Sequence, residues 1–148
     1  MQHLQNGTDL KRAWLTYCWA APASLLGLLL ATTLLLGRGA GRGKARWHSG
    51  VLEVSGGFPG WLLSRRLPFS GSAAAITLGH VVLAQSSAAL VQTRRHERVH
   101  VAQYERWGGL FLLAYPLASL WAGLRGKDPY LDNVFEVEAR GGNKPIAR

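Results

Sequence analysis

The sequence predicts a small α+β domain that follows one N-terminal transmembrane helix. Three segments lead to this prediction: an uncharged apolar run at residues 14–37, a β-branched apolar stretch at residues 73–84, and an amphipathic segment with the string His-Glu-x-x-His that ends at Trp107. The chain has 148 residues, a length that suits one domain. We expect a short β-sheet together with the His-Glu-x-x-His helix, an apolar helix and a short helix that bears glutamates.

The first apolar run is predicted to be a membrane anchor that follows an N-terminal tail at residues 1–13. Residues 14–37 contain no charged side chain, and about 20 apolar residues suffice to cross a bilayer as a helix. A cleaved signal peptide is the rival interpretation, but the apolar region of such a peptide is usually about 7–15 residues long. The residues that follow also offer a poor cleavage site. We therefore favour a retained, single-pass transmembrane helix.

Basic residues on the two sides of the run indicate an orientation. Lys11 and Arg12 precede it, whereas the Gly/Arg linker at residues 38–46 contains four basic residues. Because positive residues in short flanks tend to stay cytoplasmic, we expect the following domain, residues 47–142, on the cytoplasmic side. The tail at residues 143–148 completes the chain.

The net charge of +9 points to lipid rather than to nucleic acid as a partner. Six of the seventeen basic residues lie in the first 46 positions, where topology and anionic lipid explain them. The others are scattered, and the sequence contains no aromatic RNA-binding motif or DNA-reading helix. Membrane lipid is the expected partner, and nucleic acid is not.

The first half of the domain is predicted to supply the strands. Residues 47–57 are typical of a short strand, and Gly57-Phe58-Pro59-Gly60 of a turn. Residues 61–69 are interpreted as a second strand, placed at a sheet edge by Pro68. Residues 73–84 are predicted to form one strand with Gly79 as a possible bulge.

The second half is predicted to be helical. Ser86 or Ser87 can cap the helix that runs to Trp107 and stops at the following glycines. The apolar run at residues 110–124 contains Pro116 and is shorter than the span of about 20 residues that a crossing needs. We expect it to be a buried core helix or a helix that rests on the membrane.

A turn at residues 128–130 precedes the last predicted element. Residues 132–140 are interpreted as a short helix, with Asp132 or Asn133 as its cap and Gly141 and Gly142 at its end.

The string His-Glu-x-x-His has the spacing of a metal site. A helix advances 3.6 residues per turn, so His96 and His100 project from one face and their imidazoles can reach one zinc ion. Glu97 lies about 100° around the helix, where it suits proton transfer from a water that the metal activates. The alternative is that both histidines are hydrogen-bonded packing residues on a core-facing stripe.

A catalytic zinc site needs a third protein ligand. The metzincin extension of the motif fails, because Gln103 and Arg106 occupy its glycine and third-histidine positions. Glu136 and Glu138 are the remaining candidates, and geometry alone leaves the choice between them open. Without a metal, Glu136 would complete a capping box with Asn133, and Glu138 would be a solvated surface acid.

Three stretches together carry a family resemblance: AAAITLGHVVLA, HERVHVAQYERWG and DPYLDNVFEVEA. Over about residues 46 to 140, the chain resembles a group of small, uncharacterised bacterial membrane proteins with an HExxH helix. It looks more broadly like the gluzincin-type zinc metallopeptidases, in which a glutamate on a later helix completes the site. The resemblance implies a zincin-like domain in a bacterial inner membrane, with a strand around residues 76–82 that aligns an extended peptide.

Carried onto this chain, the resemblance makes His96 and His100 zinc ligands and Glu97 the general base. It favours Glu136 over Glu138 as the third ligand. A carboxylate in the first turn of a helix also gains about 0.3–1 kcal/mol from the helix dipole. Arg140 stands where related motifs place an aspartate, so the usual supporting acid is missing or lies elsewhere.

The sequence therefore predicts a membrane-anchored, zinc-dependent metallopeptidase that hydrolyses peptide or protein substrates. The first alternative is a non-catalytic membrane protein that uses a zincin-like fold for metal or partner binding. The second is a membrane-associated structural protein without a metal. His80, Tyr104 and Tyr130 are possible substrate-polarising groups, although packing roles are expected for them.

Overall fold

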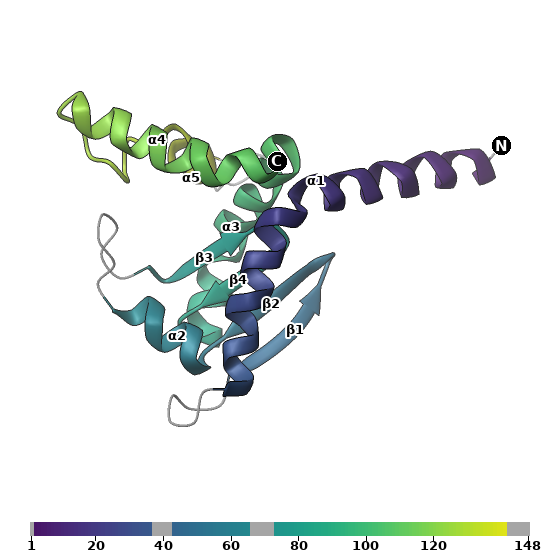
Figure 1. Cartoon of the computed structure of the whole chain (residues 1–148), viewed down its shortest axis with the longest axis horizontal. Coiled ribbons are helices and arrows are strands. Elements are labelled where there is room, and N and C mark those ends of the chain that lie inside the picture. The colour runs from purple at the N-terminus through teal and green to yellow at the C-terminus, as the bar shows by residue number, and fades with distance from the viewer. Residues whose placement is uncertain (1, 37–42, 66–72, 142–148) are drawn as a thin grey trace, which may run out of the picture.

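The fold is a four-stranded sheet surrounded by helices, which confirms the α+β class (Figure 1). The computed structural model describes residues 2–36, 43–65 and 73–141, and within the first helix it describes the side chains of residues 14–32. The helices are α1 (Gln2–Leu36), α2 (Gly57–Ser64), α3 (Ser87–Trp107), α4 (Phe111–Leu124) and α5 (Val134–Gly141), and a 3-10 turn, η1 (Gly108–Leu110), joins α3 to α4. The strands are β1 (Lys44–His48), β2 (Val51–Ser55), β3 (Ala75–Leu78) and β4 (Val81–Ala84).

The strands are arranged in the order β1-β2-β4-β3. Strands β2 and β4 run parallel in the centre, and each pairs with an antiparallel strand outside it. The predicted single strand at residues 73–84 is therefore wrong, because the chain reverses between Leu78 and Val81. Gly79 has a φ of +61°, a value that glycine adopts easily at the first position of a two-residue hairpin turn.

Three further predictions for the first half are wrong. Residues 47–57, predicted as one strand, contain the end of β1, a reversal at Ser49 and Gly50, and β2. Residues 57–64 form the helix α2 instead of a turn and the start of a strand. Pro59 lies in its first turn, where a missing N–H costs no hydrogen bond, and Leu63 packs into the core. The predicted linker at residues 38–46 also ends earlier, because Lys44 to Arg46 pair with β2 as part of β1. Residues 37–42 and Pro68 lie outside the described residues.

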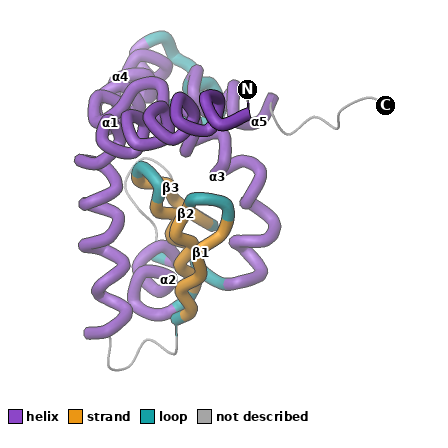
Figure 2. The backbone as a smooth tube through the Cα atoms, turned by 90° about the vertical axis from the view of Figure 1, so that its right-hand side faces the viewer, coloured by secondary structure: helices purple, strands orange, loops and turns teal. Residues whose placement is uncertain are grey.

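Helix α1 bends in its middle, and its second part runs along the sheet (Figures 1 and 2). Pro22 lies inside the helix, and a proline removes one helical hydrogen bond and kinks the chain. After the bend, Ala23, Gly27 and Ala31 are buried at intervals of four residues. A Cβ on Gly27 would lie only 2.7 Å from Cβ of Val81, so small residues allow the close contact between α1 and the sheet.

The length and composition of α1 also make it a candidate membrane span, from Trp14 to Thr32. Its outer side carries exposed apolar side chains before and after the bend, including Trp14, Leu25 and Leu29. One side of α1 therefore packs against the sheet, and its other side exposes apolar side chains.

The helices of the second half begin and end where the sequence predicted. Oγ of Ser86 accepts a hydrogen bond from the N–H of Ala89 at 3.1 Å, which confirms Ser86 as the cap of α3. Gly108, with a φ of +61°, ends that helix. Asn133 is confirmed as the cap of α5, since its Oδ1 accepts a hydrogen bond from the N–H of Phe135 at 2.9 Å.

A buried carboxylate on the sheet forms ion pairs with two arginines of helix α3. Glu53 on β2 is 2% exposed, and it accepts hydrogen bonds from Nε and Nη2 of Arg94 at 2.9 and 3.0 Å. Arg98 reaches the same carboxylate at 3.5 Å. This ion pair fixes the distance between α3 and the centre of the sheet.

Replacing Arg94 by Met should lower the free energy of unfolding by about 2–3 kcal/mol, because removing one partner leaves the buried carboxylate of Glu53 poorly compensated. Lys44→Met, which removes an exposed cation from β1, is the matched control and should change little. Chemical unfolding followed by circular dichroism in detergent measures both values. Equal losses in the two variants would contradict this role of Glu53.

Candidate metal centre

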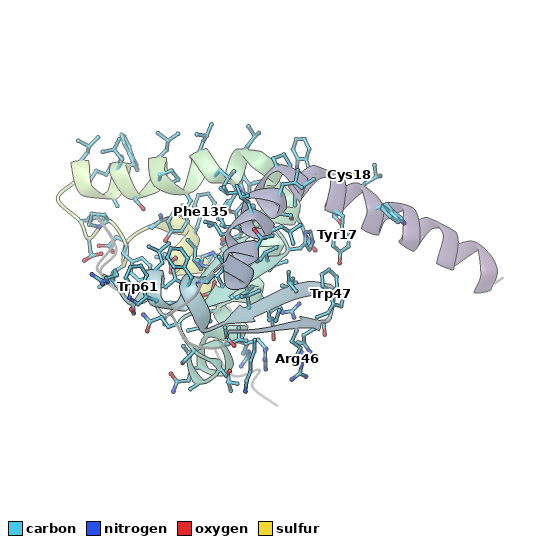
Figure 3. The ribbon with its side chains drawn as sticks, turned by 60° about the horizontal axis from the view of Figure 1, so that its bottom comes forward. Tyr17, Cys18, Arg46, Trp47, Trp61 and Phe135 are labelled. Carbon is cyan, nitrogen blue, oxygen red and sulfur yellow. The ribbon has the colours of Figure 1, made fainter. Side chains whose placement is uncertain are left out.

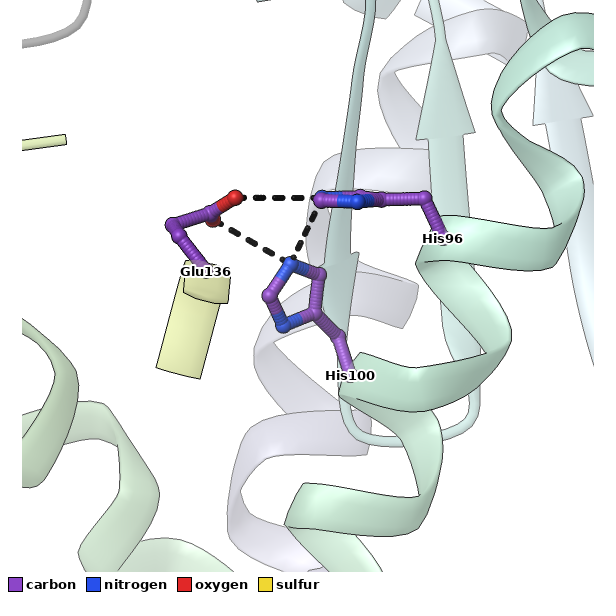
Figure 4. Close-up of side chains that lie close together, drawn as sticks. All are labelled: His96, His100 and Glu136. Atoms are coloured by element: carbon purple, nitrogen blue, oxygen red, sulfur yellow. Dashed lines mark hydrogen bonds and ion pairs between the residues drawn. The ribbon is translucent and has the colours of Figure 1, made fainter. Parts of the chain in front are cut away.

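Helices α3 and α5 bring together His96, His100 and Glu136, the three residues predicted as metal ligands (Figure 4). The histidines stand one turn apart on α3, and their Nε2 atoms are 3.0 Å apart. Glu136 reaches across from the first turn of α5, with its Oε2 3.2 Å from Nε2 of His96 and its Oε1 3.2 Å from Nε2 of His100. Donor atoms from two helices therefore converge on one point.

The spacing of these atoms fits a tetrahedral zinc ion. Ligand atoms at about 2.0–2.2 Å from such a centre lie roughly 3.3–3.6 Å from one another, a few tenths of an ångström longer than the observed separations of 3.0 and 3.2 Å. Oε2 of Glu136 is buried and lies 3.2 Å from Nε2 of His96. The short separations and the donor types both suit a metal ion.

The buried amide of Gln103 orients the imidazole ring of His100 through its Nδ1 atom. The Nε2 amide group of Gln103 donates to the carbonyl of Phe135 at 3.1 Å and to Oε2 of Glu138 at 2.8 Å. Its Oε1 must then accept, and it lies 2.8 Å from Nδ1 of His100. In its neutral form His100 therefore carries its proton on Nδ1 and its lone pair on Nε2, as a metal ligand needs. Without a metal, burial lowers the pKa of His100, but its bonds to Glu136 and Gln103 raise it by more.

The sequence had drawn attention to Gln103 only because it breaks the metzincin pattern. Gln103 is 1% exposed, and its hydrogen bonds connect His100 to helix α5. The signal that points to this role is its spacing, since Gln103 lies three residues after His100 on the same face of α3.

The structure distinguishes the two candidate glutamates. Glu138 lies away from the cluster and accepts hydrogen bonds from Gln103 and, at 2.9 Å, from Nη2 of Arg106. The capping box expected for Glu136 is not formed, because the N–H of Asn133 donates to the carbonyl of Tyr130. Glu136 is the glutamate that faces the histidines.

Hydrogen bonds keep the carboxylate of Glu136 ionised. Burial raises its pKa, but the interactions with His100, His96 and Tyr115 lower it by more, so the pKa of Glu136 lies well below the ordinary value. The Tyr115 hydroxyl donates to Oε1 of Glu136 at 2.7 Å. Sequence reasoning missed Tyr115, which lies inside an apolar run without any neighbouring motif.

Glu97, the predicted general base, lies in the same cleft as the two histidines. It is buried, and its Oε2 accepts a hydrogen bond from the Thr77 hydroxyl on β3 at 2.7 Å. Burial raises the pKa of Glu97, opposed in part by the bond from Thr77. A raised pKa makes this carboxylate a stronger proton acceptor than an ordinary glutamate.

The cleft itself has a volume of about 680 Å³, within the range of small-ligand sites. Strand β3, α3, α4 and the first turn of α5 form its walls. Tyr130 and Arg140 add polar groups at the side of α5, and the Arg140 guanidinium donates to the carbonyl of Leu131. The three donor atoms therefore face an open, largely apolar space.

Tyr130, for which a packing role was expected, instead lines the cleft and interacts with Glu136. Tyr104 and His80 lie in packing positions. Tyr104 is buried and its ring packs against Phe111 with centroids 4.6 Å apart. His80 is buried below α1, stacked on Tyr17 at 4.1 Å and with Nε2 3.1 Å from Oε1 of Glu105. Neither contacts the cluster.

A second hollow of about 570 Å³ lies between His48 and the arginines of α3. Its guanidinium groups at Arg94 and Arg98 are already bound to Glu53 and to backbone carbonyls. The cleft beside Glu136 is therefore the stronger candidate site.

Comparison with protein-family models, with curated proteins and with solved structures finds no match for this chain.

Replacing Gln103 by Leu should weaken zinc binding at this centre by about 10–100-fold, because His100 loses the partner that holds its tautomer and orientation. Gln92→Leu makes the same change at an exposed position of α3 and should have little effect. Zinc affinity is measured by competition with a coloured chelator. If the two variants bind zinc equally well, Gln103 has no supporting role.

Proposed function

We propose that His96, His100 and Glu136 bind Zn²⁺ and that the protein is a membrane-attached zinc metallopeptidase with a zincin-like domain. One observation carries this proposal: donor atoms of three residues on α3 and α5 approach one another at 3.0–3.2 Å. The carboxylate is ionised, and Gln103 binds Nδ1 of His100, which leaves Nε2 of that ring facing Glu136.

Zinc bound at such a site supplies a Lewis acid and a water of lowered pKa. The chain supplies the proton acceptor, which is Glu97. Its raised pKa suits a group that takes a proton from water and then returns it to the leaving amine. Thr77 donates a hydrogen bond to one oxygen of Glu97 and leaves the other for the cleft.

The edge of the sheet supports a peptide substrate. Strand β3 bonds to β4 on one side only, and residues 73–78 line the cleft along its other side. An extended peptide can add to such an edge through backbone hydrogen bonds. Its scissile carbonyl would then lie near His96 and Glu97.

Helix α1 is the proposed membrane attachment, in the inner membrane of a bacterium. Its exposed apolar side chains, among them Trp14, Leu15 and Leu29, support contact with lipid. The basic residues after α1 favour a cytoplasmic position for the catalytic domain.

Changing His96 to Ala or Glu136 to Gln should remove most of the bound zinc, since two protein ligands hold a catalytic metal poorly. Glu138→Gln is the matched control on the same helix and should retain the zinc, because the new amide oxygen can still accept the hydrogen bond from Gln103. Elemental analysis of the purified proteins gives the zinc content. Full zinc in both ligand variants would return the cluster to a packing role, and a loss confined to Glu138→Gln would identify that residue as the ligand.

Glu97→Gln should keep the zinc content of the wild type and lower peptide hydrolysis by about a hundredfold or more, the usual contribution of a general base. Glu105→Gln is the control, because Glu105 lies on the same helix and pairs with His80 outside the cleft. Hydrolysis is followed with a quenched fluorescent peptide library.

Unchanged hydrolysis by Glu97→Gln would exclude Glu97 as the base. Zinc binding by a wild-type protein that cleaves no peptide would favour the non-catalytic alternative, in which the domain binds a metal or a partner.

A further inference from the structure

The outward side of α4 is a continuous apolar surface. Side chains along α4 point away from the rest of the molecule in Figure 3, and six large ones are between 58% and 73% exposed. We call this surface the α4 face; it consists of Leu110, Leu113, Leu117, Leu120, Trp121 and Leu124. Their spacing of three and four residues puts them on one side of the helix.

The opposite side of α4 belongs to the cleft. Leu112, Tyr115 and Pro116 line it, and the two hydroxyl groups of the helix turn inward. Tyr115 bonds to Glu136 at 2.7 Å, and the Ser119 hydroxyl accepts from Asn133 at 2.8 Å. One helix therefore separates the α4 face from the candidate metal centre.

The chemistry of the α4 face matches a lipid surface better than a protein. Protein interfaces carry about one hydrogen bond per 100–200 Å², whereas the hydroxyls of α4 are turned to the other side. The sequence contains no acidic residue between Glu105 and Asp128. At the end of α4, the Arg125 guanidinium lies 4.3 Å from the ring centre of Trp121. Tryptophan beside a basic residue is typical of segments at an anionic membrane surface.

Helix α1 extends the same apolar layer. Its part before the bend and α4 lie on the same side of the sheet in two perpendicular views (Figures 1 and 2), and Trp14, Leu15 and Trp19 there are exposed. The helical segment Ser87–Leu124 is also a candidate span by length and composition, but its first part, α3, is held to the sheet by the Arg94–Glu53 ion pair. Helix α4 itself has 14 residues, so it measures roughly 21 Å at 1.5 Å per residue, less than the hydrocarbon core of about 30 Å. Its length suits a helix that lies on a bilayer.

We propose that the α4 face rests on the surface of an anionic lipid bilayer. The cleft then opens within one helix diameter, about 10 Å, of the lipid. Under the proposed function, on which this consequence rests, the substrates are polypeptide segments that emerge from the same membrane.

A fluorescent probe on the α4 face tests this contact without any metal or activity. Cys18, the single cysteine, is changed to Ser, and an environment-sensitive dye is attached to Leu117→Cys. Val91→Cys is the matched control, because Val91 on α3 is 65% exposed and Leu117 is 62% exposed. The full-length proteins are reconstituted into phosphatidylethanolamine–phosphatidylglycerol vesicles with nitroxide-labelled acyl chains.

The dye at position 117 should shift its emission to the blue and lose most of its intensity to the nitroxide lipids, whereas the dye at position 91 should do neither. Quenching at 117 that does not exceed quenching at 91 overturns the proposal. A blue shift at 117 that depends on protein concentration and not on the quencher also overturns it, because a second copy of the chain then covers the α4 face. Failure of the zinc proposal would leave these outcomes unchanged.

Discussion

The buried amide of Gln103 is the interaction on which the candidate site depends. It joins α3 to α5 by bonding to the Phe135 carbonyl and the Glu138 carboxylate, and it bonds in the other direction to His100. A buried amide that loses its partners costs about 1–3 kcal/mol for each unsatisfied group. This network therefore holds the histidines and the glutamate in one relative position and also sets the tautomer of His100.

Helix α5 needs this external support, because a helix of eight residues is marginal by itself in water. Asn133 ties its start to α4 through the Tyr115 carbonyl at 3.1 Å, and Phe135 packs against Phe111 with ring centroids 4.8 Å apart. These contacts fix the rotation of α5 about its axis. The buried position of Phe135 turns Glu136 toward the histidines and leaves Glu138 at the surface.

Sequence patterns predicted the helices better than the sheet, for physical reasons. The cap at Ser86 and the stop at Gly108 are local signals, and they located α3 correctly. Gly79 fits a bulge and a hairpin turn equally well, so the reversal between β3 and β4 had no local signature. Strand β1 is exposed along most of its length. The sequence therefore shows no pattern of buried apolar residues that would distinguish this strand from the basic, glycine-rich segment around it.

The site shows the same division between local and tertiary information. The spacing of His96 and His100 follows from the helix itself, whereas the choice of Glu136 over Glu138 depends on how α5 packs. The role of α1 was also hidden in the sequence, since small residues such as Ala23 and Gly27 within an apolar run look alike whether they face a sheet or a neighbouring membrane helix.

Charge balance gives the last argument about the centre. Glu97 and Glu136 are both buried. In the metal-free cluster, burial lowers the pKa of His100 but its bonds to Glu136 and Gln103 raise it by more, which favours its charged form; as metal ligands both imidazoles would be neutral. Two carboxylates in a low-dielectric cleft repel each other and are poorly solvated, and among the described residues that line the cleft Arg140 is the one side chain with a permanent positive charge. Its guanidinium is exposed and donates to the Leu131 carbonyl. A divalent cation between the histidines and Glu136 would supply the missing charge next to both carboxylates.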